Sequence, residues 1–502
     1  MIKNVAEYLE ATAARVPNKL AFADVKNEIS FSELRRQSRA IASSFARKGV
    51  FKKPILVALE KNIQPVSVFL GAAYSGNFYV PLDVEMPAER IRKIIESLQP
   101  AAIVTDSNYS QLVMESGADE RIVYLLEDII REPIDDTLIA SAMERQIDAD
   151  ILYVLFTSGS TGTPKGVCVT HKSVICYSEF VAEKFNMDEN VVFGQAAQFT
   201  FDTTIRNIYQ TIRNGGTDHI IPKSYLGFPI KSIGYLNERK VNTIFWTPTL
   251  LSIVAKSRIL QKNPPHYINR VIFSGEMMPI STLNVWRNAL PNATFLNVYG
   301  QTEVGDTCTY YQLERQFKEG DSIPIGYRDR NVDVFLLNDH DELCKDGEVG
   351  EICLRGSKIT PGYYNDMALT NEVLVQNPLN SSYLELIYRT GDLGYYNELG
   401  ELMLKGRKDF QIKHSGFRIE LGEIESIAEE VDGASFCTCV YDRENQQIKL
   451  FYVGEIDEAA LKTELRKSLQ SYMVPHRIKR LEVMPTMASG KTDRQKLLSL
   501  EI

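Results

Sequence analysis

The chain has 502 residues, of which 44% are hydrophobic, and its 56 Lys and Arg against 65 Asp and Glu give a formal net charge of −9. This length exceeds what a single hydrophobic core usually serves, so two or more domains are expected. The negative charge argues against a nucleic-acid partner. The sequence has no apolar run of membrane-spanning length and lacks a signal-peptide core, which predicts a cytoplasmic protein with no membrane partner.

Strand-like and helix-like stretches alternate through the first 400 residues. Residues 55–59, 102–104, 151–156 and 243–245 are short apolar runs, which are typical of buried strands. Helical patterns separate them, and this alternation predicts an α/β fold of mainly parallel sheets with flanking helices.

After residue 320 the pattern changes to short strands and Gly-rich turns. Residues 332–337 and 350–354 are examples of such strands. We expect them to form a β-rich subdomain that completes a large N-terminal domain, residues 1–408.

A second, compact piece begins near Asp409. About ninety residues are enough for a small α/β domain, and we assign it residues 409–502. The predicted elements are a helix starting at residue 421, strands at 435–441 and 449–453, and a helix at 457–469.

Residues 157–166 read Thr-Ser-Gly-Ser-Thr-Gly-Thr-Pro-Lys-Gly and follow the apolar run 151–156 directly. The chain therefore leaves a buried strand into a loop of small residues. Three glycines let the backbone approach a ligand closely, and the hydroxyl and N–H groups are donors suited to phosphate oxygens. Lys165 adds a positive charge, although a Walker loop would have Ser or Thr after this lysine. A flexible linker is the alternative, which the preceding strand disfavours.

Five further motifs occur along the chain, namely Phe201-Asp202, 297–303 (Asn-Val-Tyr-Gly-Gln-Thr-Glu), 388–392 (Tyr-Arg-Thr-Gly-Asp), 406–409 (Gly-Arg-Lys-Asp) and 490–494 (Gly-Lys-Thr-Asp-Arg). Together with the loop at 157–166, they resemble those of the adenylate-forming superfamily of acyl-CoA synthetases, luciferases and peptide-synthetase adenylation domains. They keep the family's order across nearly the whole chain, and the likeness is strongest to the amino-acid-activating branch.

The resemblance implies that the protein uses ATP and Mg²⁺. Glu303 matches the family's Mg²⁺ ligand, and a carboxylate is the hard oxygen ligand that this ion prefers. Gln301 stands where peptide-synthetase domains usually have proline, which loosens the assignment to that branch. The residues matched to ATP are Thr157, Ser158, Gly159 and Lys165 on the triphosphate, Thr302 on a phosphate, Tyr299 against adenine, and Asp392 and Arg407 on the ribose.

Two lysines and a hinge are also implied by the family motifs. Lys491 matches the lysine that stabilises charge at the α-phosphate while the adenylate forms. Lys413 lies on the segment that family members present to the active site in the second, thioester-forming step. Asp409 matches the hinge of a mobile C-terminal lid. Rotation of the lid about this hinge would bring either Lys491 or the Lys413 segment to the active site.

Asp202 begins a helical pattern and matches the residue that binds the substrate's α-ammonium in amino-acid-activating relatives. Alternatively, Asp202 caps this helix or pairs with Arg206 one turn later. The other positions matched to the substrate pocket are Thr203, Arg206, Phe245, Ile272, Ser274, Val298, Asp306 and Thr307.

The pocket positions include two further charges, on Arg206 and Asp306. Because a buried unpaired charge is costly, either Arg206 receives an acceptor group of the substrate or the two residues neutralise each other. The charges favour a polar or charged amino acid.

These assignments predict a ligase that forms an aminoacyl adenylate and passes the amino acid to the phosphopantetheine thiol of a carrier protein. The sequence shows no carrier domain after the lysine motif, so we expect that carrier to be a separate protein. The alternative is an acyl-CoA ligase for a carboxylic acid without an amino group. A luciferase-like oxygenase or a non-enzymatic nucleotide-binding protein has less support, because the residues implied for catalysis are all present.

Overall fold

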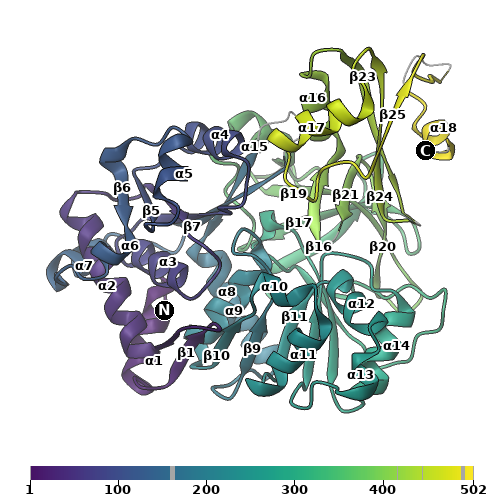
Figure 1. Cartoon of the computed structure of the whole chain (residues 1–502). Coiled ribbons are helices and arrows are strands. Elements are labelled where there is room, and N and C mark those ends of the chain that lie inside the picture. The colour runs from purple at the N-terminus through teal and green to yellow at the C-terminus, as the bar shows by residue number, and fades with distance from the viewer. Residues whose placement is uncertain (1, 159–163, 415, 444, 488–491, 501–502) are drawn as a thin grey trace.

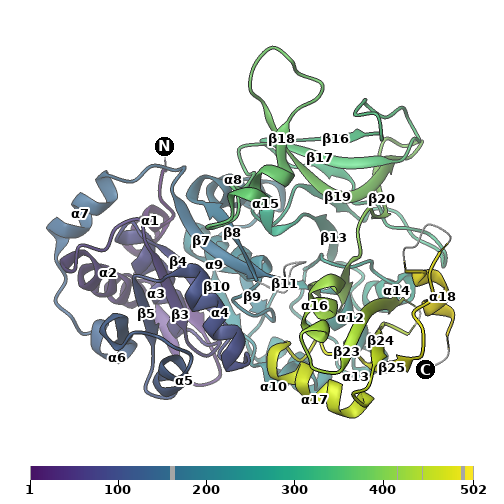
Figure 2. The same cartoon turned by 90° about the horizontal axis from the view of Figure 1, so that it is seen from above.

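A computed structural model describes residues 2–158, 164–414, 416–443, 445–487 and 492–500. Three sheets with their helices account for the chain up to Arg407, and two small sheets follow (Figure 1). Seen from above, the N-terminal elements, the third sheet and the C-terminal elements are three groups arranged around a common centre (Figure 2). The predicted α/β fold with a β-rich subdomain is confirmed.

The first sheet has six strands in the order β6-β5-β3-β4-β7-β8, and its neighbours are parallel except for β7 and β8. Strands β3 and β4 are buried along their whole length, which explains their continuous apolar sequences. The strands are β3 (Pro54–Ala58), β4 (Phe78–Leu82), β5 (Ala102–Thr105), β6 (Val123–Leu125), β7 (Ile151–Thr157) and β8 (Lys165–Thr170). The helices before β7 are α1 (Ala6–Arg15), α2 (Phe31–Arg47), α3 (Gln64–Tyr74), α4 (Ala88–Leu98), α5 (Ser110–Glu115), α6 (Leu126–Ile129) and α7 (Asp136–Glu144).

The second sheet has nine strands in the order β15-β14-β13-β12-β11-β9-β10-β1-β2, and it is parallel from β13 through β1. Its strands are β1 (Leu20–Ala23), β2 (Glu28–Ser30), β9 (Val192–Gln195), β10 (Thr217–Ile220), β11 (Thr243–Trp246), β12 (Arg270–Phe273), β13 (Thr294–Tyr299), β14 (Thr309–Gln312) and β15 (Tyr327–Arg328). The helices of this part are α8 (His171–Lys184), α9 (Asp202–Asn214), α10 (Lys223–Leu226), α11 (Pro229–Glu238), α12 (Pro248–Lys256), α13 (Ile259–Lys262) and α14 (Ile280–Ala289).

The third sheet is the predicted β-rich subdomain. It is antiparallel, and β20 pairs with β19 beside the path β16-β17-β19-β18. Its elements are β16 (Val332–Leu337), β17 (Gly350–Gly356), α15 (Met367–Val373), β18 (Leu374–Gln376), β19 (Leu386–Tyr396) and β20 (Leu402–Arg407).

The C-terminal elements have a hydrophobic core of their own, which includes Ile419, Leu450 and Leu465. This core agrees with a separate C-terminal unit, and the boundary at 408/409 stays a prediction. The elements are the hairpin β21 (Gln411–His414) and β22 (Phe417–Glu420), then α16 (Leu421–Glu429), β23 (Ala434–Asp442), β24 (Gln447–Gly454), α17 (Glu458–Ser468), β25 (Arg477–Leu481) and α18 (Arg494–Ser499).

In the described part of the chain, no helix is both long enough and apolar enough to cross a lipid bilayer.

Candidate active site

A cavity of about 410 Å³ lies between the second sheet and the β21–β22 hairpin. The ends of β7 and β11 contribute Thr157 and Trp246, and Gly300 follows β13 directly. In open α/β sheets, ligands bind outside the carboxyl ends of the strands, which is where this cavity lies. The predicted site residues that line it are Thr157, Ser158, Asp202, Thr203, Arg206, Phe245, Ser274, Thr302, Asp306 and Lys413.

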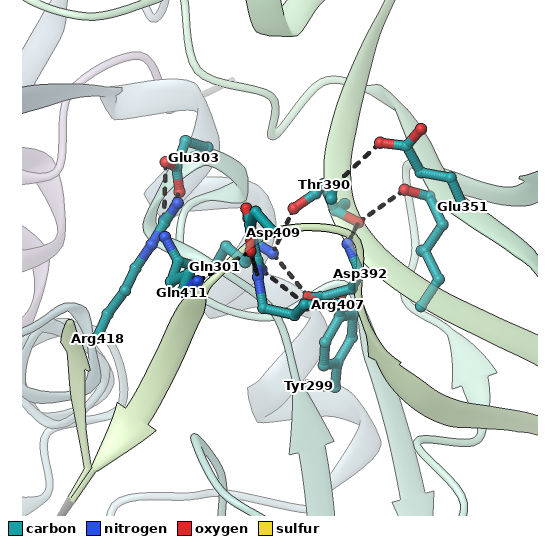
Figure 3. Close-up of polar contacts among 12 residues, drawn as sticks. Tyr299, Gln301, Glu303, Glu351, Thr390, Asp392, Arg407, Asp409, Gln411 and Arg418 are labelled. Carbon is teal, nitrogen blue, oxygen red and sulfur yellow. Dashed lines mark hydrogen bonds and ion pairs between the residues drawn. The ribbon is translucent and has the colours of Figure 1, made fainter. Parts of the chain in front are cut away.

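An ion pair between Arg418 and Glu303 connects the hairpin to the N-terminal part of the chain beside the cavity. One terminal nitrogen of Arg418 lies 2.8 Å from each carboxylate oxygen of Glu303, which is fully buried, and Figure 3 shows the two side chains facing each other. The Tyr363 hydroxyl donates a further hydrogen bond to the same carboxylate at 2.8 Å. Burial alone would raise the pKa of Glu303, but the positive charges of Arg418 and Lys165 outweigh it and lower that pKa to about 2. Glu303 is therefore an ionised carboxylate.

The same hairpin also occupies the hydrogen-bonding groups around the predicted phosphate loop. Ser158 Oγ donates to the backbone oxygen of Arg418 at 2.9 Å and accepts from the N–H of Glu420 at 3.2 Å. Lys165 Nζ lies 3.4 Å from the Glu420 carboxylate. Gly159, which was also assigned to this loop, lies outside the described residues. The hairpin thus contacts two of the residues that were predicted to hold a triphosphate.

Aromatic packing and a second ion pair hold the C-terminal unit in this position. Phe417 stacks on Tyr472 with ring centroids 3.6 Å apart, and it meets Phe201 edge-on at 4.9 Å. Arg90 of α4 forms an ion pair with Glu423 of α16 at 2.5 Å, and both side chains are buried. Apolar and charged contacts therefore both link the N-terminal part to the C-terminal unit.

A polar network surrounds Asp392, the predicted ribose ligand. Its Oδ2 accepts hydrogen bonds from the Tyr299 hydroxyl at 2.5 Å and from Gln301 Nε2 at 2.7 Å, and its Oδ1 accepts from Arg407 at 2.7 Å (Figure 3). Arg407 also binds both oxygens of Asp409, at 2.7 and 2.8 Å. Gln301 is therefore part of the network that orients Asp392, which proline at this position would be unable to join.

Asp202 is the first residue of α9, one position after the N-cap Phe201. Its Oδ2 accepts a hydrogen bond from Thr302 Oγ1 at 2.9 Å, so the carboxylate faces the 302–306 loop rather than capping the helix. Burial raises the pKa of Asp202 to about 6, the nearby Asp306 adds to the shift, and Arg206 opposes it. Lys413 also opposes the shift through its positive charge, so two carboxylates and two cations lie in this region.

Arg206 and Asp306 neutralise each other, which is the second of the two alternatives that the sequence left open. The guanidinium binds both carboxylate oxygens, through Nε and a terminal nitrogen, and each side chain is only 3% exposed. The guanidinium carbon also lies 5.2 Å from the ring centroid of Phe245, within reach of a cation–π contact.

Several predicted residues lie away from the cavity lining. Ile272 and Val298 belong to a hydrophobic cluster that also contains Phe245, and Thr307 is buried beside Asp306. Five further predicted residues do not line the cavity but take part in the networks described above. They are Lys165, Tyr299, Glu303, Asp392 and Arg407. Lys491 lies outside the described residues.

Arg418 was not among the predicted site residues, although the sequence around Gly416 contains a signal for it. Lys413 and Arg418 are directly opposite partners in the β21–β22 ladder, and both line the cavity. Side chains of opposite residues in an antiparallel pair lie on the same face of the sheet. A hairpin assigned around Gly416 would therefore have placed Arg418 beside Lys413.

The profile of the AMP-binding enzyme family matches residues 9–364, and the chain therefore belongs to this family. Tyrocidine synthase 1 of Brevibacillus parabrevis is 30% identical over 99% of the chain, which spans only 45% of that protein. A D-alanine--D-alanyl carrier protein ligase of Bacillus velezensis is 27% identical, and the match covers 96% of each protein. The fold is also that of the Vibrio cholerae adenylation domain AlmE, solved with glycyl-adenosine-5'-phosphate, at a TM-score of 0.85, 20% identity and coverage of 99% and 98% of the two chains.

The Arg206–Asp306 pair predicts strong energetic coupling in a double-mutant cycle. Because each single change leaves a buried charge without its partner, Arg206→Ala and Asp306→Ala should each lower the free energy of unfolding by about 3–5 kcal/mol. The double variant should lose less than the sum, which denaturant titration will measure.

An exposed ion pair provides the control for this cycle. Arg239 and Glu28 pair at 3.0 Å with side chains 24% and 58% exposed, so their coupling should stay below about 1 kcal/mol. Additive losses at Arg206 and Asp306 would contradict the assignment of a buried, mutually neutralised pair.

Proposed function

We propose that the chain activates an amino acid with ATP as its aminoacyl adenylate, releases pyrophosphate, and transfers the amino acid to the phosphopantetheine thiol of a carrier protein. The charge balance at the start of α9 carries this proposal. Asp306 is matched by Arg206, whereas no cation among the described residues forms an ion pair with Asp202. The α-ammonium of an amino acid would supply a direct ion-pair partner for Asp202, which Lys413 influences without pairing with it. The names of the carrier protein ligase and of the glycyl-adenylate complex support the same reading.

In the adenylation step, we assign ATP to the loop after β7 and to the Asp392 network. Thr157, Ser158, Gly159 and Lys165 would hold the triphosphate, with Thr302 on a phosphate. Asp392 and Arg407 would bind the ribose and Tyr299 the adenine. The Asp392 oxygens are hydrogen-bond acceptors suited to ribose hydroxyls.

Glu303 has the properties expected of the proposed Mg²⁺ ligand. It is buried and ionised, and a Mg²⁺ ion that also binds substrate phosphates commonly takes one or two protein carboxylates. The metal would neutralise charge on the phosphates. Arg418, the cation that contacts Glu303 in this structure, would have to leave that carboxylate first.

The position of the hairpin supports a division of the reaction between two lid arrangements. While Arg418 binds Glu303 and Glu420 binds Lys165, the groups proposed for a metal triphosphate already have partners. We therefore assign this arrangement to the transfer step, after pyrophosphate has left, with Lys413 at the cavity. Lys491 would act in the other arrangement, and Asp409 would be the hinge between them.

The direct test is amino-acid-dependent exchange of pyrophosphate into ATP across a panel of amino acids. At least one amino acid should stimulate exchange, and the thiol of a phosphopantetheinylated carrier should then accept it. If only fatty or aryl acids stimulate exchange and coenzyme A accepts the product, the chain is an acyl-CoA ligase instead.

The role of Asp202 predicts a pH dependence. Its carboxylate faces Asp306, Arg206 and Lys413, and its pKa of about 6 means that the negative form, which an ammonium requires, is lost as the pH falls through that value. The kcat/KM for the amino acid should then fall about tenfold per pH unit below the pKa. Asp202→Asn should have a low kcat/KM that is flat over the same range. A wild-type profile without this slope would rule out ammonium binding by Asp202.

Arg418 and Lys491 should affect opposite half-reactions. Arg418→Met removes the ion pair that holds the hairpin at Glu303, so thiol transfer from preformed adenylate should fall about ten- to a hundred-fold, as for the loss of a charged hydrogen bond. Adenylate formation should be retained. Lys491→Ala should show the reverse pattern in single-turnover measurements.

Arg480→Met, a change at an exposed arginine of β25, is the matched control and should leave both half-reactions unchanged. Equal losses in both half-reactions for Arg418→Met would contradict the assignment of the hairpin arrangement to transfer.

A further inference from the structure

We infer that the pocket selects amino acids with a small, uncharged side chain, because the Arg206–Asp306 pair closes the end of the cavity. This inference rests on the proposed function and adds the class of amino acid to it. Arg206, Asp306 and Phe245 all line the cavity, and Phe245 also packs with Ile272 and Val298 behind it. Phe245 is thus the member of the cluster that faces the cavity, and the Arg206–Asp306 pair lies beside it.

The residues behind Phe245 were expected to line a deeper pocket. Ile272 is fully buried and Val298 is 3% exposed, and they pack with Phe193 and Leu296 in the same cluster. A substrate side chain would reach them only if the ion pair separated or Phe245 moved. The effective end of the pocket is thus set by side chains of α9 and the 302–306 loop, not by those of β12 and β13.

The distance along α9 limits the length of the substrate. Asp202 and Arg206 are four residues apart, so they lie on the same face of the helix with Cβ atoms about 5–6 Å apart. A ligand with its ammonium at Asp202 meets the guanidinium of Arg206 within one helical turn. That space suits a hydrogen or a methyl-sized side chain better than a ring or a long chain.

Among the described residues, the Arg206–Asp306 pair also leaves no free ion-pair partner at the end of the pocket for a charged substrate side chain. Arg206 binds both oxygens of Asp306, and the Thr307 hydroxyl donates to the same carboxylate at 3.4 Å. A substrate carboxylate or ammonium here would have to displace one partner and leave the other charge buried alone. The structure therefore disfavours the polar or charged amino acid that the sequence suggested.

The test compares pyrophosphate exchange for glycine, alanine, valine, leucine, phenylalanine, aspartate and lysine. In the wild-type protein, glycine or alanine should give the highest kcat/KM. The kcat/KM for leucine should be lower by about tenfold or more, because each methylene that does not fit the pocket has a cost of this order. The variant Arg206→Ala/Asp306→Ala removes both charges and opens the end of the pocket. Its preference should move toward leucine or phenylalanine by about ten- to a hundred-fold relative to alanine.

A second double variant separates size from charge. Arg206→Met/Asp306→Leu removes both charges but keeps the volume filled, so it should retain the preference for small side chains. Calorimetric binding of non-hydrolysable glycyl and leucyl sulfamoyl adenosines to all three proteins gives a readout that does not require turnover, and thermal unfolding checks that each variant is folded.

The outcomes distinguish this inference from the proposed function. If no amino acid supports exchange, the proposed function fails. If amino acids support exchange but the wild-type protein prefers leucine, phenylalanine or a charged residue, the inference is overturned while the proposed function stands. Unchanged preference in Arg206→Ala/Asp306→Ala, in both exchange and analogue binding, would also overturn it.

Discussion

The ion pair between Arg418 and Glu303 is the interaction on which the arrangement of this active site depends. Glu303 is fully buried, and an ionised carboxylate in that position is costly without a cation beside it. Arg418 supplies that cation from the C-terminal hairpin, so the position of the hairpin and the charge state of the N-terminal site are coupled. Under the proposed function, the metal that accompanies the triphosphate would bind the same carboxylate, so Arg418 would have to leave it first.

A similar charge balance governs the substrate end of the cavity. Asp202 and Asp306 both lie near Arg206, and the bidentate geometry pairs Arg206 with Asp306, while Lys413 adds a second positive charge nearby. Asp202 is left with a hydroxyl donor, Thr302, and a raised pKa. The pairing of Arg206 with Asp306 therefore underlies both the proposed binding of an ammonium at Asp202 and the inferred preference for small side chains.

The fold was largely predictable because its elements have local signatures. Buried parallel strands such as β3 and β7 are continuous apolar runs, and α9 ends at Gly215 in the left-handed conformation that glycine favours. The site was predictable only in part. Motifs identified Asp202, Thr302 and Lys413 at the cavity, whereas Ile272 and Val298 were placed in its lining by analogy and lie behind it.

The sequence by itself determined the class of fold and the identity of most charged groups near the cavity, because these depend on neighbouring residues. Only the tertiary structure decided how those charges pair. Arg206 and Asp306 are 100 positions apart, and Glu303 and Arg418 are 115 apart. Nothing local in the sequence fixes such contacts, since they follow from how the 302–306 loop, α9 and the hairpin pack. Burial then makes each pairing obligatory, because a charge removed from water requires a partner.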